Sequence, residues 1–293
     1  TLGLVASMRT ENDTDAMDGA TVTRCGLRWY KNRVLVSHDT DSKDLHDLQD
    51  DRDRVRAVLT MAYVVSGRLL LANSFSQFSP ETLHDLTRTF PYHPAPKSAR
   101  PVDAFVADEP AVYDFEVTPQ WHQVTFFNAD PDHPKTVGIR IAGPQVDGAL
   151  GLDPSREYHL FDFWNHRYLG KLAGDARIEQ ELRPGEARML SVRECLGRPQ
   201  VVSTDRHLMQ GYLDLVKVDW DAATRRLTGT SRIIGGDPYT VTLALNGHRP
   251  RSVSCADRRV AARLFEARDE TVEFALEGPA NATVEWSVSF DPE

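Results

Sequence analysis

The chain has 293 residues, which exceeds one average domain and allows two folded units with a sizeable core. Hydrophobic residues make up 41% and charged residues 26%, as in globular proteins, and no apolar run reaches the roughly 20 residues of a membrane helix. The formal net charge of -9 disfavours contact with a phosphate backbone, so we expect neither a nucleic acid nor a membrane as partner.

The sequence does not open on a pattern typical of secretion. Residues 1–7 carry no positive charge and only a short apolar stretch, whereas a signal peptide begins with basic residues before its apolar segment. This favours a cytoplasmic over a secreted location.

Residues 1 to about 90 alternate between short apolar runs and helical periodicity, the pattern of βα units with a parallel sheet. Strands are expected at 2–7, 33–37 and 68–72, each nearly apolar throughout as buried parallel strands require. One helix lies between the last two strands, with Asp50 or Asp51 as its cap and Gly67 as its stop. A second helix opens at Ser79 and ends before Pro91. We predict an α/β domain over 1–100.

The pattern changes after a segment rich in proline. Residues 91–110 hold five prolines, which break helices and favour extended backbone, so a domain boundary is placed here. From there on apolar residues alternate with polar ones, as in Val137, Ile139 and Ile141, which predicts half-buried antiparallel strands. Turn-forming residues separate the runs. Residues 101–293 are therefore an antiparallel β-sandwich region, either one sandwich or two subdomains divided near residue 200.

Polar residues follow each of the three expected parallel strands. The segment after the first includes Arg9 and Asp13, the one after the second includes Asp39 and Asp41, and Asn73 follows the third. In parallel α/β barrels the catalytic residues come from these carboxyl ends. Taken alone, Asp13 could equally be a capping or solvated loop residue.

These segments resemble those of a known enzyme family. Arg9-x-x-x-Asp13-Thr14 is similar to the Arg-x-x-x-Asp-Thr segment of family 36 α-galactosidases and their melibiase relatives. Arg28-Trp29 with Asn32, Asp39 and Asp41 resembles their Arg-Trp, Asn, Asp-Pro-Asp segment, although Thr40 replaces the proline. Asn73 stands where that family commonly has an aspartate. The resemblance covers residues 1 to 200 and is fainter beyond.

The resemblance implies the last three βα units of a (β/α)8 TIM-type barrel, followed by the sandwich. It also implies retaining hydrolysis of a terminal α-linked sugar, most simply an α-galactoside, in which one carboxylate attacks and a second protonates the leaving oxygen. Asp13 takes the role of general acid/base. Arg9, Trp29, Asp39, Asp41 and Asn73 take substrate-binding or positioning roles. No cofactor and no metal are implied.

The attacking carboxylate has no counterpart in this sequence. In the family it lies in a Lys-x-Asp segment after an earlier barrel strand, so it is expected from an N-terminal remainder of the barrel or from another chain, with a homo-oligomer as one arrangement. This chain by itself is then an incomplete enzyme of carbohydrate metabolism.

Three alternatives stay open. His38, Asp39 and Asp41 could be read as metal ligands, but no second histidine cluster completes a zinc site. Trp29 could stack on a sugar ring or fill a helix–sheet interface. The whole chain could be a non-catalytic carbohydrate-binding or structural β-sandwich module that carries a barrel remnant. Which α-linked sugar would bind is undetermined.

Overall fold

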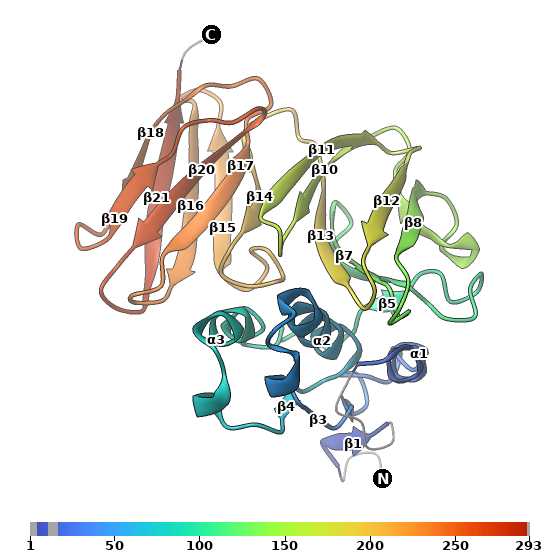
Figure 1. The fold of residues 1–293 in the computed structure, drawn as a ribbon. Coiled ribbons are helices and arrows are strands. Elements are labelled where there is room, and N and C mark those ends of the chain that lie inside the picture. The colour runs from blue at the N-terminus through green and yellow to red at the C-terminus, as the bar shows by residue number, and fades with distance from the viewer. Residues whose placement is uncertain (1–4, 11–16, 292–293) are drawn as a thin grey trace. The chain divides into compact units, whose positions relative to one another are not determined.

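A computed structural model describes residues 5–10 and 17–291 (Figure 1). The chain forms two compact units, one of Thr1–Glu157 with Leu172–Val192 and the other of Tyr158–Lys171 with Arg193–Glu293. These units are defined by compactness, and the domain bounds expected from the sequence, 1–100 and 101–293, stay predictions. None of the helices in the described part of the chain has the length and the apolar character needed to cross a membrane.

The first unit holds the helices and eleven of the described strands. The helices are α1 (Gly19–Gly26), α2 (Arg52–Val65) and α3 (Pro80–Thr87). The strands are β1 (Ser7–Arg9), β2 (Ser37–Asp39), β3 (Ser42–Lys43), β4 (Leu70–Leu71), β5 (Arg100–Pro101), β6 (Val112–Thr118), β7 (Trp121–Phe127), β8 (Lys135–Ala142), β9 (Ala149–Leu152), β12 (Arg177–Leu182) and β13 (Ala187–Glu194).

The helix predicted before Gly67 is confirmed as α2. Its N-cap is Asp51, whose side chain accepts hydrogen bonds from the amides of Asp53 and Arg54, and its C-cap is Ser66. These caps satisfy backbone groups that the helix leaves without intrahelical partners. The second predicted helix is confirmed as α3, with Ser79 as N-cap and Pro80 in the first turn.

Helices α2 and α3 are joined by a buried charge cluster. The carboxylate of Asp85 on α3 is 1% exposed, and it accepts hydrogen bonds at 2.7 Å from Arg52 and 2.8 Å from Arg56 on α2. Burial alone would raise the pKa of Asp85, but these hydrogen bonds hold it below its ordinary value. The ionised carboxylate therefore holds the two helices together.

The parallel strands near the N-terminus are short. Strand β1 pairs in parallel with β2, and β3 pairs in parallel with β4. The first strand was predicted at 2–7, of which 2–4 lie outside the described residues. The second, predicted at 33–37, lies at Ser37–Asp39 instead. The chain turns at Arg33, where φ is 61° and the amide of Arg33 donates to the carbonyl of Val36. Whether these strands belong to a (β/α)8 barrel stays a prediction.

The remaining strands of the first unit follow the predicted alternation. Strands β13, β7, β6 and β5 are neighbours in that order, and β12, β8 and β9 form a second sheet. The apolar side chains of β8, Val137, Ile139 and Ile141, are all buried. One pairing departs from the antiparallel prediction, since β9 runs parallel to β8. Gly143 and Gly148 have positive φ, which permits the tight return between the two strands.

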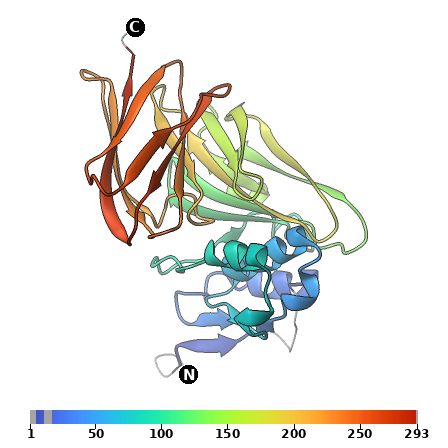
Figure 2. The ribbon, with the colours of Figure 1, turned by 60° about the vertical axis from the view of Figure 1, so that its left-hand side comes forward.

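The second unit is built from antiparallel sheets (Figures 1 and 2). One sheet has the order β14-β17-β20-β19 and the other has the order β15-β16-β21-β18. The unit also contains the hairpin strands β10 (Glu157–Asp162) and β11 (Arg167–Ala173). The strands of the two sheets are β14 (Gln200–Thr204), β15 (Leu215–Asp221), β16 (Arg226–Ile233), β17 (Tyr239–Ala244), β18 (Pro250–Cys255), β19 (Ala261–Leu264), β20 (Thr271–Glu277) and β21 (Ala282–Phe290).

The two four-stranded sheets share one apolar core. Val241 and Phe274 from the first sheet lie in the same buried cluster as Trp286 and Val288 from the second. The rings of Phe274 and Trp286 have centroids 4.8 Å apart, and the indole nitrogen of Trp286 donates to Ser231 Oγ at 2.8 Å. Facing antiparallel sheets with a common core fit the predicted β-sandwich.

Candidate functional site

The carboxyl ends of β1 and β2 lie side by side. The strands are parallel, with Ser7 opposite Ser37 and Arg9 opposite Asp39. The ladder continues one residue further, because the amide of Thr10 donates to the carbonyl of Asp39 at 3.0 Å. Side chains that follow these strands are therefore brought to one edge, which is where catalytic groups of parallel α/β folds gather.

Arg9 and Asp41 form an ion pair at this edge. Arg9 Nη2 donates to Asp41 Oδ1 at 2.8 Å, and the two side chains are 45% and 17% exposed. Asp41 has a φ of 70°, a conformation that aspartate tolerates better than most residues. Its Oδ1 also accepts from the amide of Ser42 at 2.8 Å, so the carboxylate is held from two sides.

Asp39 lies beside this pair and orders the same loop. Its Oδ1 accepts from the amide of Asp41 at 2.9 Å, and its Oδ2 lies 3.9 Å from Nη1 of Arg68. The structure thus brings together three of the residues predicted from the sequence, Arg9, Asp39 and Asp41, and adds Arg68. Two cations and two carboxylates at one strand edge can orient sugar hydroxyls through charge-assisted hydrogen bonds.

Asn73 and Trp29 make contacts of their own, and neither forms a hydrogen bond or ion pair with Asp39 or Asp41 in the described part of the chain. Asn73 Oδ1 accepts from the amide of Leu45 at 3.0 Å, which ties the residues after β4 to those after β3. Trp29 is half-buried, and its ring makes an edge contact with Tyr30 at a centroid distance of 6.3 Å. Asn73 therefore has a loop-ordering contact, and a role in binding a sugar stays a prediction for both residues.

Asp13, the predicted general acid/base, lies outside the described residues, as does all of 11–16. Its place relative to Arg9 and Asp41 stays a prediction.

Three basic side chains at this edge carry no role predicted from the sequence. Arg28 donates to the carbonyl of Thr10 at 2.6 Å, and Arg68 approaches Asp39. Lys43 is fully buried and donates to the carbonyl of Thr40. Arg28 adjoins Trp29 within the motif that carried the resemblance, which could have indicated it. The roles of Lys43 and Arg68 depend on strand pairing, which local pattern does not reveal.

His38 is a buried neighbour of the acidic loop. It is 1% exposed, and burial, followed by the positive charge of Arg28, lowers its pKa to about 4. The imidazole is therefore neutral near pH 7 and contributes no charge to the edge. Across the described residues, no three side chains of histidine, cysteine, aspartate or glutamate are grouped as metal ligands would be.

No protein-family model matches the sequence, and no curated protein matches it either. Solved structures do match. A family 27 β-L-arabinopyranosidase of Geobacillus stearothermophilus superimposes with a TM-score of 0.50 and 16% identity over 66% of this chain and 46% of that one. The chain shares a fold with this glycosidase.

Two further similar structures are α-galactosidases. That of Mortierella vinacea gives a TM-score of 0.44 with 14% identity over 64% of this chain and 53% of that one. That of Saccharomyces cerevisiae gives 0.46 with 10% identity over 66% and 60%. The chain spans about half the length of the solved proteins it matches. None of these three is described as a member of family 36, so that narrower resemblance stays a prediction.

Proposed function

We propose that this chain is part of a retaining glycoside hydrolase that acts on terminal α-linked sugars, most simply α-galactosides. The observation that carries the proposal is the cluster of Arg9, Asp39 and Asp41 at the adjoining ends of two parallel strands. The fold shared with a family 27 glycosidase supports it.

In this proposal Asp13 is the general acid/base. It follows Arg9 by four residues, so chain length alone keeps it within about 14 Å of the end of β1. A carboxyl that donates a proton near neutral pH needs a raised pKa, which burial or a neighbouring carboxylate supplies. Asp39 and Asp41 are suitable neighbours, and Arg9 limits the repulsion among the three acids.

Arg9 is a positioning residue in this scheme. Its guanidinium is paired with Asp41, which fixes the direction of the side chain at the strand edge. Arg68 could serve Asp39 in the same way. The loop that ends β2 is thereby ordered before a sugar arrives, which lowers the entropic cost of the reaction geometry.

The attacking carboxylate is proposed to come from barrel strands outside this sequence or from another chain. Within the described residues β1 has a single strand neighbour, β2. Met8 on β1 and Val5 just before it are 44% and 41% exposed. An exposed strand edge with apolar side chains is normally covered in a parallel sheet. Further strands of a barrel would cover it and would supply the second carboxylate.

The test is hydrolysis of an aryl α-galactoside by the complete assembly that contains this chain. Asp13→Asn should remove nearly all turnover while the fold is kept, because the amide cannot donate the proton. Asp108→Asn, which changes an exposed aspartate elsewhere in the first unit, is the matched control.

Full turnover by the Asp13→Asn variant would exclude Asp13 as proton donor. Unchanged sugar affinity with no turnover in the unmodified assembly would instead favour the non-catalytic carbohydrate-binding module.

A further inference from the structure

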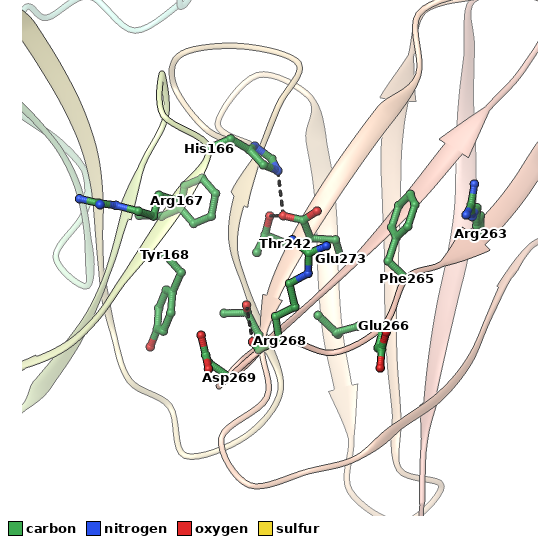
Figure 3. A pocket seen from close by; sticks show the side chains of 13 residues that line it. His166, Arg167, Tyr168, Thr242, Arg263, Phe265, Glu266, Arg268, Asp269 and Glu273 are labelled. Atoms are coloured by element: carbon green, nitrogen blue, oxygen red, sulfur yellow. Dashed lines mark hydrogen bonds and ion pairs between the residues drawn. The ribbon is translucent and has the colours of Figure 1, made fainter.

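The second unit contains a pocket of about 610 Å³ that the proposed hydrolase chemistry does not use (Figure 3). One wall comes from the β10–β11 hairpin, with His166 and Tyr168, and the other comes from the segment between β19 and β20, with Phe265 and Arg268. All the lining residues belong to this unit. The pocket therefore depends on this unit alone.

Two aromatic rings flank the pocket. Figure 3 shows Tyr168 on one side and Phe265 on the other. The hydroxyl of Tyr168 lies 2.8 Å from His159 Nδ1 and donates to Glu270 at 3.3 Å, which fixes the ring. The guanidinium of Arg263 lies over the ring of Phe265 at 4.9 Å from its centroid. Aromatic rings restrained by such contacts offer apolar surface to the C–H face of a sugar.

Glu273 provides an acceptor between the rings. Its Oε1 lies 2.8 Å from His166 Nε2 and accepts from Thr242 at 3.4 Å. Both of these contacts are made by Oε1, and within the described part of the chain Oε2 accepts no hydrogen bond from another residue. The hydrogen bond from His166 lowers the pKa of Glu273, so the group is an anion that can accept from a ligand hydroxyl. Arg268 lines the same pocket, and its positive charge also lowers the pKa of Glu273.

The charges of the lining balance. The lining includes three arginines and three carboxylates, and His166 adds a charge only when it is protonated; these residues are Arg167, Arg263 and Arg268, and Glu266, Asp269 and Glu273. A strongly charged ligand would meet like charges in this lining, whereas a polyol uses both donors and acceptors.

We propose that this pocket binds a neutral saccharide, by stacking on Phe265 and Tyr168 and by hydrogen bonds to Glu273, Arg268 and Asp269. This site is independent of the proposed hydrolytic site and needs no catalysis. It would hold a sugar chain or a sugar product on the sandwich unit.

Titration of the full chain with melibiose and with methyl α-glucopyranoside, followed by backbone amide NMR shifts, tests the proposal. Shifts should concentrate in the hairpin around 166–168 and in the segment 263–273. Glu273→Gln and Phe265→Ala should each weaken binding by roughly fivefold or more, the equivalent of losing about one hydrogen bond or one ring contact. Glu285→Gln and Phe105→Ala, which change exposed residues outside the pocket, should leave the affinity unchanged.

A charged analogue separates this proposal from an ion site. Galacturonate should bind no more tightly than melibiose. Absence of shifts in the pocket with either neutral sugar in the folded protein would overturn the proposal, as would tighter binding of galacturonate or equal affinity in the pocket variants and the controls.

Discussion

Arg9 Nη2 lies 2.8 Å from Asp41 Oδ1, although 32 residues separate them in sequence. The contact exists because β1 and β2 are parallel neighbours, so that the residues after each strand meet at one edge. An exposed ion pair contributes little to stability, with a typical value below about 1 kcal/mol. The pair therefore matters more for the geometry of the edge than for the fold.

Replacing Arg9 should consequently separate activity from stability. Arg9→Ala should lower kcat/KM of the complete assembly by about tenfold to 100-fold through misplacement of the acidic loop, with little change in Tm. Arg177→Ala, which removes another exposed pair in the first unit, is the control. Equal activity of the two variants would show that Arg9 positions nothing.

Removing the buried carboxylate between α2 and α3 should destabilise the first unit strongly. Asp85→Ala leaves Arg52 and Arg56 without their shared partner, and breaking a buried pair in this way costs about 3–5 kcal/mol. Because Arg52 is 45% exposed, we expect the lower end of that range. Chemical denaturation measures the loss, and a cost within the range of a surface substitution would contradict the interpretation.

The same cluster should make the stability of the first unit depend on pH. The folded-state pKa of Asp85 lies below its ordinary value, so its contribution to stability is complete above about pH 4 and is lost as the pH falls through the folded-state pKa. The difference in Tm between the wild type and Asp85→Asn should therefore narrow in acid. A constant difference between pH 7 and strongly acidic solution would argue against the ionised carboxylate as the cause.

Gly229 on β16 should tolerate no side chain. A Cβ at this position would overlap the ring of Trp286 on β21, which is opposite Gly229 in the strand register. Overpacking of this kind costs about 1–3 kcal/mol, so Gly229→Ala should lower the unfolding midpoint of the second unit. Thr228→Ala, on the exposed face of the same strand, should change it much less. Similar midpoints for the two variants would mean that the indole can move aside.

Tyr239 should stabilise the second unit through its hydroxyl. The hydroxyl donates to Asp214 Oδ2 at 2.7 Å, and both residues are buried. Tyr239→Phe keeps the ring but leaves a buried carboxyl oxygen without this donor, at a cost of about 1–3 kcal/mol. Asp214→Asn, which keeps an acceptor oxygen, should cost less. Denaturant titration measures the free energy of unfolding of both variants. An unchanged value for Tyr239→Phe would contradict a stabilising role of the hydroxyl.

Helix bounds were predicted from local signals. Asp51 and Ser79 cap α2 and α3, and caps act within one turn of the chain, so their effect can be recognised without knowledge of the fold. Helix α1 was not predicted, because Val22 and Cys25 are its only large apolar residues and give too weak a periodicity. The second parallel strand was displaced from 33–37 to Ser37–Asp39, because pairing with β1 decides which residues extend.

The sequence by itself determined the alternation that forms the antiparallel strands, the caps of two helices and the acidic segments after the expected parallel strands, since all of these are properties of neighbouring residues. Only the tertiary structure decided that Arg9 meets Asp41, that Arg68 approaches Asp39, and that Tyr168, Phe265 and Glu273 share one pocket. Arg9 and Asp41, Arg68 and Asp39, and Tyr168 and Glu273 are each far apart in sequence, so the pairing and packing of strands rather than local preference bring them within reach.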